Sequence, residues 1–273
     1  MHSRLTLNQV SLAENATAVP GADAMLRDIE LCQAAGIERI GIRAAMLEAN
    51  GWGPGIEQLR NSALQVTHLV HRAMFELDNP ASWPAAQERG RDVAAAAAAL
   101  DAPLVYLTSG PAGSLLFEQA AEAFVAAVAP VVGFCAERGV ELAVETANPQ
   151  YHDIHMLHTL RDTIDVANRA GMKVCVDLHA CWTEPNLRTL LRDASGSIAL
   201  VQLGDYSLGQ HSLTRAIPGE GMIPLERIVG WLVDDGYQGL FDLEFPGDHC
   251  VPRASAVQRA VQNMDAMMVR LGL

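Results

Sequence analysis

The sequence predicts an α/β protein, a single (β/α)8 TIM barrel that spans residues 1–273 as one domain. A short apolar run, a polar loop and a longer Ala- and Leu-rich stretch recur eight times, and glycines follow the longer stretches. Strands that alternate with helices pair in parallel through crossovers, and eight units without a break in composition favour a closed barrel over an open sheet. Such barrels commonly run to about 250 residues as one domain.

The expected strands and helices follow in order along the chain. Apolar runs predict strands at residues 5–12, 39–43, 66–71, 104–107, 140–146, 173–179, 198–205 and 240–245. Amphipathic stretches between them predict helices, among them residues 22–35, 117–138 and 157–170. Gly36, Gly139 and Gly171 follow these three stretches, as expected of residues that close helices in the left-handed conformation.

The charge balance indicates which partners to exclude. The chain has 19 Lys and Arg against 32 Asp and Glu, which gives a formal net charge of -13. Nucleic acid and anionic membrane surfaces need clustered basic residues for tight binding, so we expect neither as a partner. A small-molecule substrate fits better, bound by a monomer or a homo-oligomer.

Cysteine usage and the N-terminal segment bear on the compartment. The five cysteines contain no CxxC pair, and they are Cys32, Cys135, Cys175, Cys181 and Cys250. This scatter is typical of a reducing compartment rather than of a disulfide scaffold. Residues 1–10 lack a basic segment leading into an apolar one, and no run approaches the ~20 apolar residues of a membrane span. We therefore expect a cytoplasmic protein.

Side-chain alternation along the last four expected strands turns polar groups into the barrel. Glu145 shares one face of its strand with Ala143, whereas Val144 lies on the face toward the helices. The same parity turns three further side chains inward on the next strands, Asp177, Gln202 and Glu244. Buried ionisable groups are costly unless they are paired, hydrated or coordinated. Glu141 and Lys173, nearer the strand starts, are expected to pair in the barrel floor.

The four inward polar groups, Glu145, Asp177, Gln202 and Glu244, fall at the C-terminal ends of successive strands, where the catalytic groups of such barrels lie. Three carboxylates and one amide oxygen form an all-oxygen donor set that leaves positions for water or substrate. This set favours one divalent ion, Mn²⁺ or Mg²⁺, with Co²⁺ or Zn²⁺ as alternatives, over a closed thiolate zinc site. Four separately hydrogen-bonded loop residues are the competing interpretation.

Five segments carry a resemblance to a known family. They are ETAN at 145–148, VDLH at 176–179, VQLGD at 201–205, PGEGMIPL at 218–225 with Arg215 before it, and FDLEF at 241–245. Together they resemble the xylose-isomerase-like TIM-barrel superfamily, which includes ketose 3-epimerases, inosose isomerases and dehydroshikimate dehydratases. The resemblance implies that Glu145, Asp177 and Glu244 bind the metal, that both glutamates also move protons, and that Arg215 contacts a substrate oxygen.

Departures from the family pattern bear on the substrate. The isomerase and epimerase branches usually have His where Gln202 stands, and Gln there resembles some dehydroshikimate dehydratases. The epimerases follow their ExxN motif, here Glu145 to Asn148, with a substrate-binding Glu where this chain has Tyr151. We therefore expect Asn148 and Tyr151 to contact a different substrate. A trinuclear zinc site, as in the endonuclease branch, is not expected, because its extra histidines are missing.

Other side chains are candidates for the pocket by position. His179 lies two residues beyond Asp177 and shares its inward parity if the strand continues, which makes it a candidate acid or base. His155 is the best candidate of three histidines near a helix start. Three more candidates end or follow strands two, three and six, and they are Arg43, His71 and Trp182. A structural role is the alternative for each of these residues.

Two reactions fit the predicted site. In the first, a keto-sugar, cyclitol or related polyol loses the proton beside its carbonyl through a metal-bound enediolate and regains it as an epimer or isomer. In the second, the same intermediate expels a β-hydroxyl or glycosidic oxygen, helped by an acid such as His179, so that the enzyme is a dehydratase or β-eliminating lyase. A non-catalytic sugar-binding barrel is the third interpretation. We expect the isomerase or epimerase.

Overall fold

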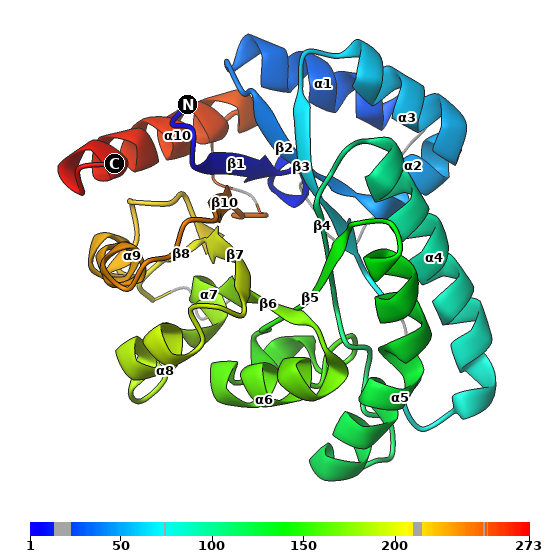
Figure 1. Cartoon of the computed structure of the whole chain (residues 1–273). Coiled ribbons are helices and arrows are strands. Elements are labelled where there is room, and N and C mark those ends of the chain that lie inside the picture. The colour runs from blue at the N-terminus through cyan, green and yellow to red at the C-terminus, as the bar shows by residue number, and fades with distance from the viewer. Residues whose placement is uncertain (14–22, 74, 210–214, 248, 250) are drawn as a thin grey trace.

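Eight parallel strands close into a barrel, and helices surround it on the outside (Figure 1). The computed structural model describes residues 1–13, 23–73, 75–209, 215–247, 249 and 251–273. Around the ring the strands follow the order β1, β10, β7, β6, β5, β4, β3 and β2. The predicted (β/α)8 barrel is therefore confirmed.

The bounds of the elements are as follows. The barrel strands are β1 (Leu5–Asn8), β2 (Arg39–Arg43), β3 (Gln65–His71), β4 (Leu104–Leu107), β5 (Glu141–Glu145), β6 (Lys173–Asp177), β7 (Ile198–Leu203) and β10 (Leu240–Leu243). The α-helices are α1 (Ala24–Ala34), α2 (Ala44–Asn50), α3 (Trp52–Asn61), α4 (Trp83–Ala99), α5 (Phe117–Ala136), α6 (Leu160–Ala170), α7 (Leu178–Cys181), α8 (Leu187–Asp193), α9 (Leu225–Asp234) and α10 (Arg253–Arg270). Short 3-10 helices are η1 (Gln9–Leu12), η2 (Pro80–Ser82) and η3 (Pro149–Tyr151), and β8 (Asp205–Tyr206) pairs antiparallel with β9 (Arg215–Ala216).

Two predicted strands end earlier than expected because a polar side chain caps the backbone that follows. The strand predicted at 5–12 ends at Asn8, whose Oδ1 accepts a hydrogen bond from the Val10 amide at 3.0 Å. The strand predicted at 173–179 ends at Asp177, whose Oδ1 accepts from the His179 amide at 2.9 Å, and α7 begins at Leu178. His179 therefore does not share the strand parity of Asp177, which corrects the prediction.

The strands separate an outer apolar core from a smaller inner cluster. Val144 belongs to the outer core, whereas Ala143 packs in the inner cluster with Cys175, as the predicted alternation requires. The predicted pair of Glu141 and Lys173 is wrong. Glu141 is exposed at the start of β5, and Lys173 Nζ donates instead to the Gly196 carbonyl at 2.9 Å. The parity of both residues allows an inward direction, but the rim of the barrel leaves their charges in contact with water.

A β-bulge between β2 and β3 makes room for a buried histidine inside the barrel. Ile40 pairs with Val66 and Gly41 with His68, so that Thr67 has no partner across the ladder. The His68 ring then lies against Gly41, where a Cβ atom would come within 1.9 Å of Nε2. Glycine is therefore required at this position by the close approach of the ring.

Helix α5 corrects the expectation that no segment has the length and composition of a membrane span. Within the part of the chain that the structure describes, α5 alone meets such a test. Its Ala120, Phe124 and Val128 side chains are buried in the core that surrounds the barrel. Core helices also pass this test, so the finding is weak evidence for a membrane.

Candidate metal and substrate site

Three carboxylates meet at the C-terminal end of the barrel. Glu145 is the last residue of β5, Asp177 is the last residue of β6, and Glu244 directly follows β10. Each offers one ligand atom, and these atoms all lie within 4.8 Å of one another. Asp177 and Glu244 are buried and Glu145 is nearly so. The structure thus brings together all three carboxylates that the strand parity turned inward.

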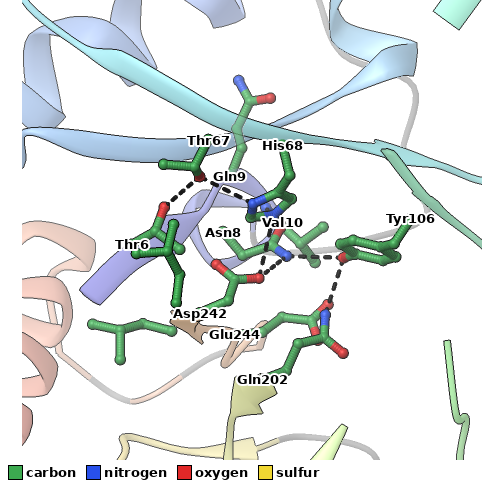
Figure 2. Close-up of polar contacts among 12 residues, drawn as sticks. Thr6, Asn8, Gln9, Val10, Thr67, His68, Tyr106, Gln202, Asp242 and Glu244 are labelled. Atoms are coloured by element: carbon green, nitrogen blue, oxygen red, sulfur yellow. Dashed lines mark hydrogen bonds and ion pairs between the residues drawn. The ribbon is translucent and has the colours of Figure 1, made fainter. Parts of the chain in front are cut away.

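The fourth predicted ligand, Gln202, is held by a hydrogen bond from its amide nitrogen. Its Nε2 donates to Tyr106 Oη at 3.0 Å, and its Oε1 is buried without a hydrogen-bond partner among the described residues (Figure 2). Tyr106 Oη also accepts from Asn8 Nδ2 at 2.9 Å. A buried amide oxygen that lacks a partner is unusual, because such an atom loses hydration without compensation. This oxygen is therefore an unsatisfied acceptor inside the barrel, although Gln202 does not line the cavity beside the carboxylates.

The amide orientation of Gln202 is supported by a polar network across the barrel (Figure 2). Asn8 Oδ1 accepts from the Val10 amide, which leaves Nδ2 to donate both to Tyr106 and to Asp242 Oδ2, the latter at 2.7 Å. His68 Nε2 lies 3.4 Å from the same Asp242 oxygen, and its Nδ1 is 3.0 Å from Thr67 Oγ1. Buried networks of this kind stabilise one arrangement of their members.

The donor set fits a hard divalent ion. Three carboxylates and an amide oxygen are the ligands that Mg²⁺ and Mn²⁺ prefer, and no thiol belongs to the cluster of described ligand residues. Burial raises the pKa of Glu145 to about 8, with the Asp177 charge adding to the rise. Burial also raises the pKa of Glu244 well above its ordinary value. Three adjacent negative charges are therefore unfavourable here without a cation or a bound proton.

Arg215 partly neutralises the carboxylates from β9. Its Nη2 lies 2.7 Å from Asp177 Oδ2, and its Nη1 lies 2.9 Å from Glu244 Oε2. Nη1 also donates to the Glu244 carbonyl at 3.1 Å. A Cβ at Gly204 would come within 2.8 Å of both the Arg215 side chain and that carbonyl, so the small residue allows the approach. The Arg215 guanidinium is buried, so its ion pairs with Asp177 and Glu244 lie in surroundings of low dielectric constant.

His155 lies beside Glu145 in the neutral form. Its Nδ1 accepts from the Ser109 amide at 3.3 Å, which leaves the hydrogen on Nε2, 3.6 Å from Glu145 Oε2. Burial lowers the pKa of His155 to about 3. His179, by contrast, does not line the cavity that opens beside the carboxylates, and its ring lies against Tyr206. Burial, with the Arg215 charge adding to the effect, lowers the pKa of His179 to about 4. His155 is thus better placed than His179 to act on Glu145.

A cavity of about 500 Å³ opens beside the carboxylates, and only some of the predicted substrate-binding residues line it. Arg43, Tyr151, His155 and Arg215 line it, but Asn148, His71 and Trp182 do not. Asn148 Oδ1 instead caps η3 by accepting from the Gln150 amide at 3.0 Å. His71 alternates with Val70 and Arg72, which face the cavity, so it points to the helix side of β3. Trp182 packs against the outer core.

Five further polar lining residues were not singled out from the sequence, and they are Glu48, Arg72, Arg89, Tyr106 and Thr108. Thr108 and Arg72 directly follow strands β4 and β3, so their position after a predicted strand could have identified them as cavity residues. Glu48 and Arg89 lie on helices α2 and α4, where nothing in a single sequence marks them out. Only the closed barrel brings these helices to the cavity.

Gln9 and Asp28 lie beside Arg43, the last residue of β2. Gln9 Oε1 accepts from the Arg43 amide at 2.9 Å, and Gln9 Nε2 donates to Asp28 Oδ2 at 2.8 Å. Burial raises the pKa of Asp28 to about 6, although the Gln9 hydrogen bond and the Arg43 charge oppose the rise. Ionised Asp28 is therefore a source of instability at neutral pH.

Asp28→Asn is expected to raise the free energy of unfolding by about 3 kcal/mol near pH 8 and to change it little near pH 4. The pKa of Asp28 is higher in the folded chain than its ordinary value of 3.8, so its contribution to stability is present below that value and is lost as the pH rises through about 6. Asparagine stays neutral and can still accept the Gln9 hydrogen bond. Urea unfolding at the two pH values measures the effect, and a variant no more stable than the wild type near pH 8 contradicts it.

Comparisons with known proteins agree with the fold. The profile of the family described as xylose isomerase-like TIM barrel matches residues 56–267, which is most of the chain. No curated protein matches the sequence significantly. Among solved structures, the chain is similar to protein SMc04130 from Sinorhizobium meliloti 1021, with 23% identity over 97% of this chain and 98% of that one, at a TM-score of 0.83.

Two other structural relatives have named ligands. The chain is 17% identical to the IOLI protein with a bound zinc atom, over 98% of this chain and 99% of that one, at a TM-score of 0.79. It is also 17% identical to D-psicose 3-epimerase from Clostridium cellulolyticum H10 with D-tagatose, over 98% and 99% of the two chains, at a TM-score of 0.76. At these identities the likeness establishes the fold.

Proposed function

The chain belongs to the xylose isomerase-like TIM-barrel family, and on this premise we propose that it is a divalent-metal-dependent isomerase or epimerase of a keto-sugar, cyclitol or related polyol. One observation carries the proposal: the ligand atoms of Glu145, Asp177 and Glu244 converge at the wall of a cavity of about 500 Å³. The volume suits a small polar molecule. The epimerase and the zinc-containing relative of the same fold support this choice.

Glu145, Asp177 and Glu244 would hold the ion, with Gln202 Oε1 as a neutral fourth donor. A divalent ion in such a site supplies Lewis acidity, which acidifies the C–H bond beside a carbonyl. Arg215 is shared between Asp177 and Glu244 and also lines the cavity, so its guanidinium is available to a substrate oxygen.

We infer that Glu145 and Glu244 act on a substrate from two sides. Their strands, β5 and β10, are separated in the barrel ring by β6 and β7. One glutamate accepts the proton beside the carbonyl, and the other delivers a proton to the opposite face for an epimer or to the neighbouring carbon for an isomer. His155 Nε2 lies 3.6 Å from the Glu145 carboxylate and borders it without a hydrogen bond. Burial keeps the Tyr151 phenol protonated, since it raises the pKa, and Tyr151 can donate to a substrate oxygen.

Elimination of a β-hydroxyl or glycosidic oxygen is the second candidate function. Gln202, at the position where the isomerase branches usually have histidine, favours it. The expected acid for that reaction, His179, does not line the cavity, whereas Tyr151 does. A non-catalytic sugar-binding barrel ranks third, because it does not need three buried carboxylates at one point.

One experiment separates the three functions. The Mn²⁺-loaded protein is incubated in D₂O with a panel of keto-sugars, inososes and keto-glycosides, and the products are followed by NMR and mass spectrometry. Deuterium at the carbon beside the carbonyl without loss of a group is the expected result. Loss of water or of an alcohol instead identifies a lyase. Saturable binding without any exchange across the panel contradicts both enzymatic proposals.

A further inference from the structure

We propose that the substrate carries an anionic group, a carboxylate or a phosphate, which Arg43, Arg72 and Arg89 bind at the end of the cavity away from the carboxylates. All three arginines line the same cavity as Glu145, Asp177 and Glu244. The inference rests on the proposed function in one respect, since it takes the reacting carbon to lie at the glutamates. It adds a charged substrate class to the neutral polyols considered above.

The arginines lie across the barrel from the carboxylates. Arg43 ends β2 and Arg72 directly follows β3, and these two strands are neighbours in the ring. The strand directly opposite β2 in the ring is β6, which ends in Asp177. Arg89 reaches the cavity from α4, the helix that follows β3. A ligand that spans the cavity therefore meets carboxylates at one end and guanidinium groups at the other.

The basic side of the cavity has more positive than negative charge. Its lining contains three arginines and one acidic residue, Glu48, which pairs with Arg89 at 2.6 Å. Arg43 has the Asp28 carboxylate nearby. Arg72 forms no ion pair with any residue that the structure describes, and its Nε is buried without a partner. Partly buried charges are normally paired, so Arg72 is the surplus cation of this wall.

Arg43 and Arg72 are neighbouring positive charges, and their repulsion is unfavourable in the folded chain. Burial is the main cause that lowers the pKa of Arg43, the Asp28 carboxylate opposes it, and the neighbouring Arg72 guanidinium adds to the lowering by repulsion. An anion bound between the two guanidinium groups removes that repulsion and gives the buried Nε of Arg72 a partner. The chain as a whole is strongly acidic, with 32 acidic against 19 basic residues, so a wall of three arginines is not a consequence of composition.

The guanidinium geometry selects the anion type. Its planar fork donates two parallel hydrogen bonds to a carboxylate or phosphate, and such charge-assisted bonds are about twice as strong as neutral ones. A neutral polyol is bound well by amide, hydroxyl and carboxylate groups and does not need a surplus cation. The cavity thus combines a proton-transfer end for a keto-polyol with an end for its carboxylate or phosphate.

The test uses three matched ligands that differ at one end: D-glucitol, D-gluconate and D-glucitol 6-phosphate. Their affinities for the Mn²⁺-loaded protein are measured by calorimetry. We expect at least one of the two anions to bind tenfold or more tighter than glucitol, and the tighter anion identifies the carboxylate or the phosphate as the preferred group. Equal affinities, or no binding of either anion, overturn the proposal.

Variants locate the anion. Arg72→Met is expected to weaken the preferred anion at least tenfold and to leave glucitol unchanged, whereas Arg72→Lys retains part of the preference because it keeps the charge. Arg91→Met is the matched control, since Arg91 lies on the same helix as Arg89 but pairs with Glu88 in solvent. If Arg72→Met, with its fold verified by circular dichroism, leaves the anion affinity unchanged, the anion binds at the metal centre and the proposal is wrong.

These experiments distinguish a failure of the anion-binding proposal from a failure of the proposed function. A protein that binds the anion through Arg72 but exchanges no proton in D₂O, even when keto-sugar phosphates and keto-aldonates are added to the panel, contradicts the proposed function alone. A protein that exchanges the proton of neutral keto-sugars and shows no preference for anions contradicts this inference alone.

Discussion

Glu145→Gln and Glu244→Gln are each expected to reduce deuterium exchange beside the substrate carbonyl by about 10³-fold at saturating Mn²⁺. Glutamine keeps an oxygen that can bind a cation, but it cannot accept a proton. Both glutamates line the cavity, and their strands approach it from separate sides of the ring. Exchange into the substrate is measured by NMR, with the metal content of each variant determined in the same samples.

The environment of Glu145 suits it to proton transfer. An ordinary glutamate, with a pKa of about 4.3, is a weak base. Burial raises the pKa of Glu145 to about 8, and a cation on the neighbouring carboxylates would oppose that rise because its charge favours the ionised form. A base is most effective when its pKa lies near the pH at which it works.

Glu141→Gln is the matched control for these variants, because Glu141 lies on the same strand as Glu145 but is exposed at its other end. It is expected to exchange at the wild-type rate. If Glu145→Gln or Glu244→Gln also does so with its metal in place, that glutamate is only a ligand. His155 does not replace it as a base through Nε2, because the Ser109 amide donates to Nδ1 and the ring hydrogen is then on Nε2.

The barrel could be predicted from one sequence because its signals are local and repeated. Gly36, Gly139 and Gly171 adopt positive φ of 67–68° where the predicted helices end, which glycine alone does without strain. Alternation along β5 and β6 then placed Glu145 and Asp177 on the inner face. The convergence of the carboxylates follows from parity and strand order together, and both are visible in the sequence.

Features that depend on contacts between distant segments could not be predicted. His179 left the strand because the Asp177 side chain binds its amide, a choice between two local conformations that alternation does not decide. The inward turn of His68 needs both the bulge at Thr67 and the missing side chain of Gly41. The arginine wall likewise exists only when α4 packs against the barrel and brings Arg89 toward Arg72.

The last expected result concerns Arg215, whose substitution should act on stability and on metal affinity in opposite directions. Arg215→Met is expected to lower the free energy of unfolding of the metal-free protein by about 3–5 kcal/mol, because it leaves buried carboxylates without a counter-charge. Asp177 and Glu244 are only 1% and 6% exposed, so water cannot replace the guanidinium. Both lose a contact shorter than 3 Å.

A divalent ion should reverse most of this loss. The guanidinium repels a cation bound by the same carboxylates, so Arg215→Met is expected to bind Mn²⁺ at least tenfold tighter than the wild type. A bound ligand stabilises the folded state by an amount that grows with the logarithm of its affinity. Thermal unfolding in excess EDTA and at saturating Mn²⁺ measures both effects. Arg270→Met, which removes an exposed pair with Glu226, should unfold like the wild type in both conditions. Equal stabilisation of Arg215→Met and the wild type by Mn²⁺ contradicts the competition between guanidinium and cation, because removing a repelling charge 2.7 Å from a ligand oxygen must otherwise strengthen the binding of the ion.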